Sequence, residues 1–209
     1  MDCPASLNLL RAAHHIDQQA TLAVNSLHCP ATDALWQFFS ERWIWSLLYA
    51  AVLFFLYRRL GWKRAAVVAL ACVLTVLACD QLGNFVKVRV GRLRPCWDLN
   101  MVDGGLHILE GKGSRYGFYS AHAANAAGFA LCSWLGFRCD RTHRYRTYGW
   151  LVFLWAFLVG ISRVFVGKHF LGDVLAGFCA GLLIGWAMAS AARCLIGRLS
   201  GSGSPRRIR

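Results

Sequence analysis

Five long apolar runs restrict what this sequence can fold into. They cover residues 43–57, 65–86, 120–137, 148–166 and 170–196. A helix crosses a hydrocarbon core of about 30 Å with about 20 residues, and only structures that satisfy their own backbone hydrogen bonds span a bilayer. We therefore predict an all-α fold: a polytopic membrane helical bundle with about five transmembrane helices.

The composition supports a membrane-embedded chain over a soluble one. Hydrophobic residues make up 57% of the sequence and charged residues 16%, and the mean hydropathy is +0.42. The net charge of +13 would suit a nucleic-acid binder, but the basic residues fall in short clusters between the apolar runs. Such clusters are typical of loops that flank a bilayer, so we expect no nucleic-acid partner.

The apolar runs belong to a single predicted domain, residues 1–199. Residues 1–40 lack a basic segment followed by a continuous apolar core, so they predict an N-terminal interfacial segment and not a secretory signal. The last ten residues, SGSGSPRRIR, predict a disordered basic tail over 200–209.

Basic clusters follow the first and third apolar runs, and another begins near the end of the fifth run. These clusters are Arg58, Arg59, Lys63 and Arg64, then Arg138, Arg141, Arg144 and Arg146, then Arg193, Arg198, Arg206, Arg207 and Arg209. The positive-inside rule assigns all three, and the C-terminus, to the cytoplasm. The loop 87–119 then lies on the opposite side of the membrane.

The nine cysteines give no sign of a metal or dithiol site, because no CxxC pair occurs. Five of them lie inside apolar runs, where cysteine acts as a small hydrophobe. Cys29 and Cys96 leave a disulfide open, although free thiols fit the sequence better. No group of carboxylates, histidines or cysteines has ligand spacing either, so we expect no metal and no cofactor.

Three polar stretches interrupt the apolar pattern at one membrane face: KVRVGRLRP at 87–95, YGFYSAHAAN at 116–125 and SRVFVGKHFLGD at 162–173. Charges at a membrane edge are costly unless they are paired, hydrated or functional. Lys87, Arg94 and Arg163 would repel one another unless an anion lay between them, and a phosphoryl group suits lysine and arginine. Ser120, at a predicted helix start, adds a hydroxyl group.

Two histidines add reactive groups to this cationic cluster. His169 and Asp173 are four residues apart, so on a helix the carboxylate can hold one ring nitrogen while the other attacks. His122 comes from another helix and can protonate a leaving oxygen. These residues predict a metal-free phosphoryl-transfer site.

Each residue also has a simpler structural explanation when taken alone. Lys87 and Arg94 fit lipid-headgroup anchors, and Lys168 is a candidate to neutralise Asp173. Asp80 and Asn84 fit a structural polar seam. Three glycines spaced by four residues, Gly177, Gly181 and Gly185, predict close helix packing. These explanations do not account for three polar stretches at one membrane face.

At these residues the sequence resembles the type 2 phosphatidic acid phosphatase superfamily, with its motifs KxxxxxxRP, PSGH and SRxxxxxHxxxD. The first and third motifs match at Lys87, Arg94 and Pro95, and at Ser162, Arg163, His169 and Asp173. The second keeps Ser120 and His122 but has Tyr119 for proline and Ala121 for glycine. The resemblance covers residues 65–196.

The resemblance implies roles for these residues. His169 would be the nucleophile that forms a phosphohistidine, Asp173 its orienting acid, and His122 the acid and then the base. Lys87, Arg94, Ser120 and Arg163 would hold the phosphoryl oxygens. Vanadium haloperoxidases share this arrangement but are soluble, which the apolar runs disfavour.

Two further stretches bear on the substrate, a membrane lipid phosphate: RYGFYSAHAAN at 115–125 and NSLHCPATDALWQFFS at 25–40. They carry a softer resemblance to bacterial lipid A 4'-phosphatases. It implies the bacterial inner membrane, with the site facing the periplasm. The residues that could bind the sugar and its second phosphate are Lys112, Arg115, Trp97, Tyr116 and Tyr119. Undecaprenyl diphosphate phosphatase is the alternative activity, and a non-catalytic lipid-phosphate-binding membrane protein the alternative of another class. The oligomeric state stays open.

Overall fold

The computed structural model describes residues 4–201 and is all-α over that range, as predicted. Its helices are α1 (Pro4–Asn25), α2 (Pro30–Ser40), α3 (Ser46–Leu60), α4 (Trp62–Val90), α5 (Leu99–Asp103), α6 (Ala121–Phe137), α7 (Arg146–Phe165) and α8 (Leu171–Gly201), with short 3₁₀ turns at Trp43–Trp45 and Pro95–Trp97. Most of the predicted tail, 202–209, lies outside the described residues.

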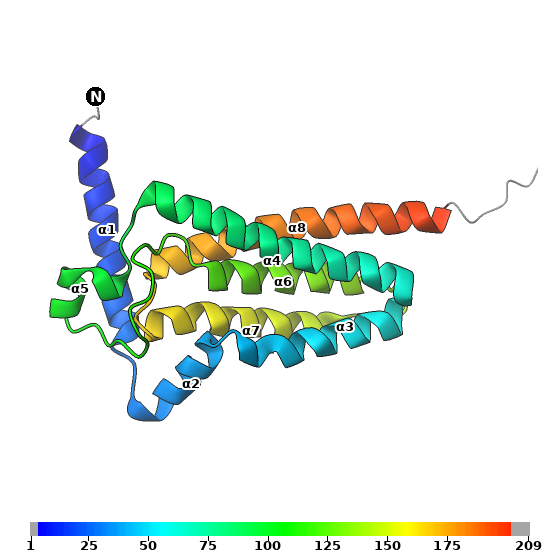
Figure 1. The fold of residues 1–209 in the computed structure, drawn as a ribbon, viewed down its shortest axis with the longest axis horizontal. Helices are drawn as coiled ribbons and strands as arrows, with labels where there is room; N and C mark the ends of the chain where they lie inside the picture. The colour runs from blue at the N-terminus through cyan, green and yellow to red at the C-terminus, as the bar shows by residue number, and fades with distance from the viewer. Residues whose placement is uncertain (1–3, 202–209) are drawn as a thin grey trace, which may run out of the picture.

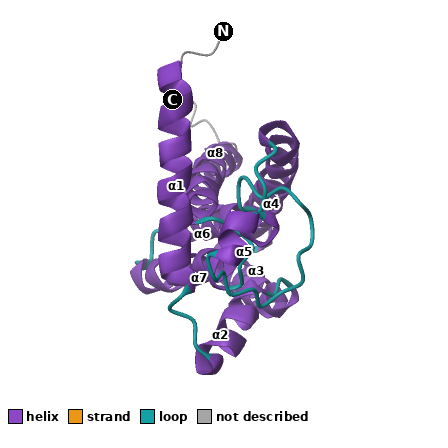
Figure 2. Ribbon diagram, turned by 90° about the vertical axis from the view of Figure 1, so that its left-hand side faces the viewer, coloured by secondary structure: helices purple, strands orange, loops and turns teal. Residues whose placement is uncertain are grey.

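The five apolar runs form five long helices that lie along one another in a bundle (Figure 1). Helix α6 is at its centre and packs against α4, α7 and α8. Helix α1 runs crosswise over one end of the bundle, where α5 and the loop 104–120 also lie (Figures 1 and 2). We call this the site end. The predicted lead-in is thus two helices, α1 and α2.

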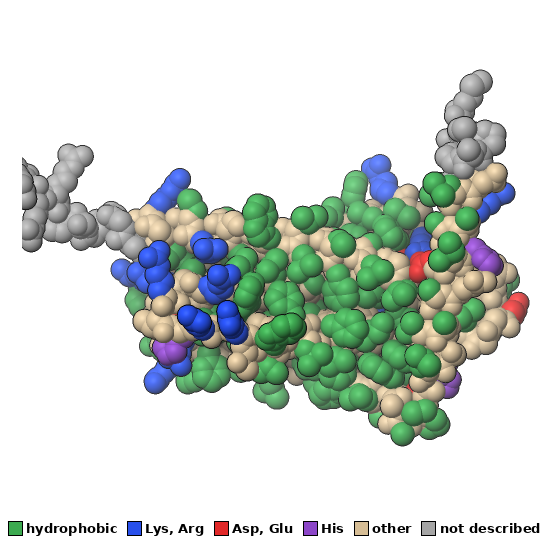
Figure 3. All heavy atoms as spheres, turned by 180° about the vertical axis from the view of Figure 1, so that it is seen from behind, with side chains coloured by type: hydrophobic (Ala, Val, Ile, Leu, Met, Phe, Trp, Pro, Cys, Tyr) green, Lys and Arg blue, Asp and Glu red, His purple; other side chains and the backbone are tan. Residues whose placement is uncertain are grey.

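Within residues 4–201, four helical segments are long and apolar enough to cross a membrane: Trp43–Leu60, Trp62–Val90, Arg146–Phe165 and Leu171–Leu199. The first joins α3 to its preceding turn. The other predicted span forms α6, which has 17 residues and a length of about 25 Å. Most α6 residues are buried by the surrounding helices, whereas large apolar side chains cover the outside of the bundle (Figure 3).

Glycines allow α6 and α8 to approach closely, as their four-residue spacing predicted. A Cβ atom at Gly177 would lie 2.5 Å from the Ser120 carbonyl oxygen, and one at Gly185 would lie 2.5 Å from the Gly128 carbonyl oxygen. A Cβ at Gly181 would collide with the backbone of Ala124. Because backbone atoms cannot move aside as a flexible side chain can, this contact requires glycine.

Basic side chains gather at the end opposite the site end (Figure 3). Arg59, Arg64, Arg138, Arg141 and Arg193 line a hollow of 920 Å³ there. We call this the basic end. Side-by-side packing of antiparallel helices places alternate loops at the same end, which explains why these clusters meet.

Cysteine pairing plays no part in the described fold. The cysteines found there are free, including exposed Cys29 and buried Cys96. The Cys96 thiol donates to the Lys112 carbonyl oxygen at 3.6 Å. The preference for free thiols is therefore confirmed for this pair.

Candidate active site

A cavity of 650 Å³ opens at the site end, and the three polar stretches meet in it. Its lining includes five of the predicted site residues, Lys87, Arg94, His122, Arg163 and His169. These come from α4, the loop after it, α6, α7 and the turn between α7 and α8. The fold thus brings together residues as distant in the sequence as Lys87 and His169, which are 82 positions apart.

The ends of the helices set the directions of these side chains. Helix α4 ends at Val90 and is capped by Gly91, whose φ of 63° lies in the left-handed region that glycine favours. The Gly91 N–H donates to the Lys87 carbonyl. The chain then turns and pairs Leu93 with Tyr116 in an isolated bridge. This turn places Arg94 beside Lys87 at the cavity wall.

His169 is buried in the turn between α7 and α8, with 2% of its surface exposed. Its Nδ1 atom lies 3.5 Å from the Asp173 Oδ2 atom, and its backbone N–H donates to the Arg163 carbonyl. Burial, with nearby Arg163 adding to it, lowers the pKa of His169 well below its ordinary value. The imidazole is therefore held neutral, the form that can act as a nucleophile.

Asp173 is fully buried and is held by three contacts besides His169. Its carboxylate accepts hydrogen bonds from the Phe170 N–H at 3.1 Å and from Arg92 Nη1 at 2.7 Å. The Asp173 carbonyl accepts from the Ser120 N–H at 3.0 Å. The last contact links the start of α6 directly to the start of α8.

Arg92 was missed from the sequence, although it lies between Lys87 and Arg94. Its guanidinium also contacts Asp17 Oδ2 at 2.6 Å and lies over the Phe170 ring at 4.0 Å. Asp17 in turn accepts from the Gly172 N–H at 2.8 Å. Helix α1 is thus tied through Arg92 to Asp173. The sequence did hold a hint of this pairing. A carboxylate buried beside a catalytic histidine needs a cation, and Arg92 lies within the first polar stretch.

Lys168 does not neutralise Asp173, which corrects that alternative. The Lys168 ammonium donates to the Gly111 carbonyl and lies 3.9 Å from Glu110 Oε2. Arg163 Nη1 lies 3.5 Å from Glu110 Oε1 and also donates to Ser40. A carboxylate from the loop 104–120 therefore lies beside Arg163, one of the cations predicted to bind an anion, and beside Lys168.

Ser120 and the residues predicted to bind a headgroup lie outside the cavity lining. Ser120 is buried, and its Oγ accepts from the Ala123 N–H at 3.5 Å as the cap of α6. Tyr119 is also buried, and its hydroxyl donates to the Cys79 carbonyl at 3.2 Å. This position does not support Tyr119 as a sugar contact, because it packs between helices.

The other residues predicted to bind a headgroup form the loop around Arg94. The Lys112 ammonium lies over the Trp97 ring at 5.0 Å. Arg94 donates from its backbone to the Arg115 carbonyl at 3.0 Å and from Nε to the Tyr116 carbonyl at 3.2 Å. Arg115 and Tyr116 thus position Arg94 through their backbone.

The polar seam predicted for Asp80 and Asn84 is present and forms part of the cavity wall. Asn125 of α6 donates to Asp80 Oδ1 at 2.8 Å. This hydrogen bond joins α4 to α6 below the cationic groups. The cavity is thus cationic near His169 and carries an acidic group deeper between the helices.

A family model described as the PAP2 superfamily matches residues 65–194. The chain belongs to this superfamily. The matched region contains each of the three polar stretches and excludes α1, α2 and α3.

Named relatives extend this likeness to most of the chain. Lipid A 4'-phosphatase of Bacteroides thetaiotaomicron is 35% identical over 88% of this chain and 80% of its own. Lipid A 4'-phosphatase of Porphyromonas gingivalis is 31% identical over 81% of this chain and 70% of its own. The fold is that of a transmembrane PAP2-type phosphatidylglycerolphosphate phosphatase from Bacillus subtilis, at a TM-score of 0.66 and 20% identity over 94% of this chain and 90% of that one. This PAP2 protein is therefore a multi-pass membrane protein.

The pairing of Arg92 with Asp173 gives a test of the site's framework. Arg92→Ala should lower the free energy of unfolding by about 3 kcal/mol, because it leaves a buried carboxylate without its cation. Chemical denaturation in detergent measures this loss. Exposed Arg89→Ala, three residues earlier, should change it by less than about 0.5 kcal/mol.

A double-mutant cycle tests whether the loss of stability in Arg92→Ala comes from its contact with Asp173. In an Asp173→Asn background, Arg92→Ala should cost much less, because the buried charge has gone. An equal cost in both backgrounds would show that Arg92 acts through other contacts.

Proposed function

We propose that this PAP2 membrane phosphatase removes the 4'-phosphate of lipid A through a phosphohistidine formed on His169. The observation that carries this proposal is the buried His169–Asp173 pair at the wall of a cationic cavity, at one end of an apolar bundle. The two lipid A 4'-phosphatase relatives match this chain over most of its length and support the choice of substrate.

The cationic residues bind the substrate phosphate. Lys87 and Arg94 contribute a point charge and a planar fork on one side of the cavity, and Arg163 contributes a second fork. The phosphate replaces the Glu110 carboxylate as the partner of Arg163 and Lys168. Ser120 keeps its capping role and fixes the start of α6, which carries His122.

The reaction proceeds in two displacements. His169 attacks phosphorus through the ring nitrogen that faces away from Asp173, a P–N bond forms, and the bond from phosphorus to the sugar oxygen breaks. His122 gives a proton to that leaving oxygen. His122 then takes a proton from water, which attacks phosphorus, breaks the P–N bond and releases inorganic phosphate. Asp173 stabilises the charge on His169 in both steps.

A glycolipid phosphate suits the location of the cavity. The cavity opens at the end of an apolar bundle, the level at which a membrane-held headgroup lies. Lys112 and Trp97, with Arg115 and Tyr116, form the adjoining loop and bind the sugar and its second phosphate. Undecaprenyl diphosphate fits the same cations and is the competing substrate.

The same charges give the orientation in the membrane. The arginine-rich basic end faces the cytoplasm, and the site end faces the periplasm across the bacterial inner membrane. This arrangement gives the cavity access to lipids of the outer leaflet.

Replacing the nucleophile tests the chemistry. His169→Ala should abolish phosphate release and any acid-labile phosphoenzyme, because no P–N bond can form. Phosphate release by purified enzyme and rapid-quench trapping of labelled phosphate measure both. His143→Ala, at the basic end, should retain full activity. Near-normal turnover of His169→Ala would reject the assignment and favour a non-catalytic binding protein.

Reporter fusions test the orientation. Alkaline phosphatase, which is active only in the periplasm, should be active when fused after Gly113 and silent when fused after Arg209. The reverse pattern would place the cavity in the cytoplasm and reject the outward-facing substrates.

Mass spectrometry of lipids tests the substrate. Expression in a host with bis-phosphorylated lipid A should give a species lighter by one phosphate, which fragmentation assigns to the distal sugar. His122→Ala should cancel this change, because the leaving oxygen is no longer protonated. Unchanged lipid A together with rapid hydrolysis of undecaprenyl diphosphate would favour the competing substrate. Loss of the phosphate from the reducing-end sugar instead would overturn the proposed regiochemistry.

A further inference from the structure

Two histidines and an aspartate meet at the site end, outside the lining of the catalytic cavity. They are His28 before α2, Asp33 in the first turn of α2, and His107 in the loop 104–120. Among the described residues they form the one group of three or more such side chains with metal-ligand spacing. Sequence spacing did not reveal this group, because His107 is 74 positions from Asp33.

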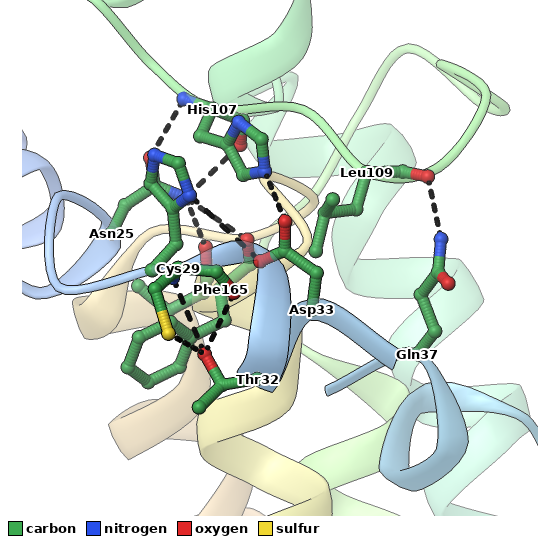
Figure 4. Close-up of polar contacts among 10 residues, drawn as sticks. Asn25, Cys29, Thr32, Asp33, Gln37, His107, Leu109 and Phe165 are labelled. Atoms are coloured by element: carbon green, nitrogen blue, oxygen red, sulfur yellow. Dashed lines mark hydrogen bonds and ion pairs between the residues drawn. The ribbon is translucent and has the colours of Figure 1, made fainter. Parts of the chain in front are cut away.

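The distances between the three side chains suit a metal ion. His107 Nε2 lies 3.2 Å from Asp33 Oδ2 (Figure 4). His28 Nδ1 lies 3.8 Å from Asp33 Oδ1. Tetrahedral zinc with bonds of about 2.1 Å separates its ligand atoms by about 3.4 Å. The two imidazole rings are stacked at 3.5 Å and 4°, so their edges lie side by side near Asp33. Because the nitrogen lone pairs lie in the ring planes, one ring must turn about its side-chain bonds for both histidines to bind the same ion.

Two of the ligand atoms lack another partner. His28 Nδ1 and Asp33 Oδ1 are buried, and neither has a hydrogen bond among the described residues. Burying an acceptor and a carboxylate oxygen without a donor costs free energy. A cation between them removes this cost.

Hydrogen bonds to backbone groups fix the segments that carry these residues without the help of an ion. Asn25, which is buried, donates to the carbonyls of His107, Val164 and Phe165 at 3.0 to 3.1 Å, and its Oδ1 accepts from the His107 N–H at 2.7 Å (Figure 4). Asp33 donates from its backbone to the Cys29 carbonyl at 3.0 Å. The backbone around the site is therefore preformed, and ion binding requires only side-chain rotation.

We propose that His28, Asp33 and His107 bind one Zn²⁺ ion that fastens the loop 104–120 to the start of α2. Two imidazoles and one carboxylate suit a borderline metal better than Mg²⁺ or Ca²⁺, which prefer oxygen ligands. A water molecule completes the fourth position. The same loop carries Glu110, which contacts Arg163 and Lys168, so the ion fixes the loop that borders the catalytic cavity.

Zinc titration of the purified full-length chain tests this site. The protein is prepared in detergent without a histidine tag, stripped with EDTA and titrated with ZnCl₂ against a chromophoric chelator. We expect one Zn²⁺ per chain. Asp33→Asn should weaken binding at least about tenfold, since even outer-sphere substitutions cost that much. The double variant His28→Ala, His107→Ala should lose stoichiometric binding.

The matched control is His143→Ala at the basic end, where His143 and Asp140 form a pair at 3.0 Å without a second histidine. This variant should bind zinc like the wild type. Zinc at 100 times its dissociation constant should also raise the Tm of the wild type by about 5 °C but leave the double variant unchanged.

The wild-type titration decides the question even if a variant fails to fold. Absence of one tightly bound Zn²⁺ in the wild type would overturn the site and leave a histidine–aspartate ion pair. Equal binding by the wild type and the double variant would also overturn it. Neither outcome depends on phosphatase activity or on the lipid substrate.

Discussion

The close contact between α6 and α8 is the constraint on which the site depends. Glycines at 177, 181 and 185 let the two backbones meet without intervening side chains. The Ser120 N–H then reaches the Asp173 carbonyl at 3.0 Å. As a result, the start of α6 with His122 is fixed beside the start of α8 with Asp173, and one bulky side chain in this contact would separate the two halves of the site.

Charge balance is the second constraint. Lys87, Arg94 and Arg163 line one cavity, and like charges in a low-dielectric region repel strongly. The Glu110 carboxylate, which comes from a loop, offsets part of this positive charge. Asp173 pairs instead with Arg92, which lies outside the cavity lining. Asp173 thus lies between Arg92 and His169, whereas Arg163 and Lys168 share the Glu110 carboxylate.

The segments outside the matched family region support the site from one side. Helix α1 contributes Asp17, which bonds both to Arg92 and to the first turn of α8, and Asn25, which joins the end of α7 to the loop 104–120. Helix α2 ends at Ser40, which contacts Arg163 and Glu110. The N-terminal helices are therefore part of the framework of the cavity as well as a predicted contact with the membrane surface.

The sequence alone determined the five long helices of the bundle, their approximate bounds and the candidate reactive residues. Long apolar runs leave few alternatives in a bilayer, and the spacing of His169 from Asp173 is local, so both were readable without a structure. Only the tertiary structure decided the partners that join distant segments: Arg92 with Asp173, Glu110 with Arg163, and His107 with Asp33. It also showed that Tyr119 packs between helices and that Ser120 caps a helix. The physical reason is that local periodicity specifies which face of a helix is buried, whereas the partner of a charge depends on which loops the packed helices bring together.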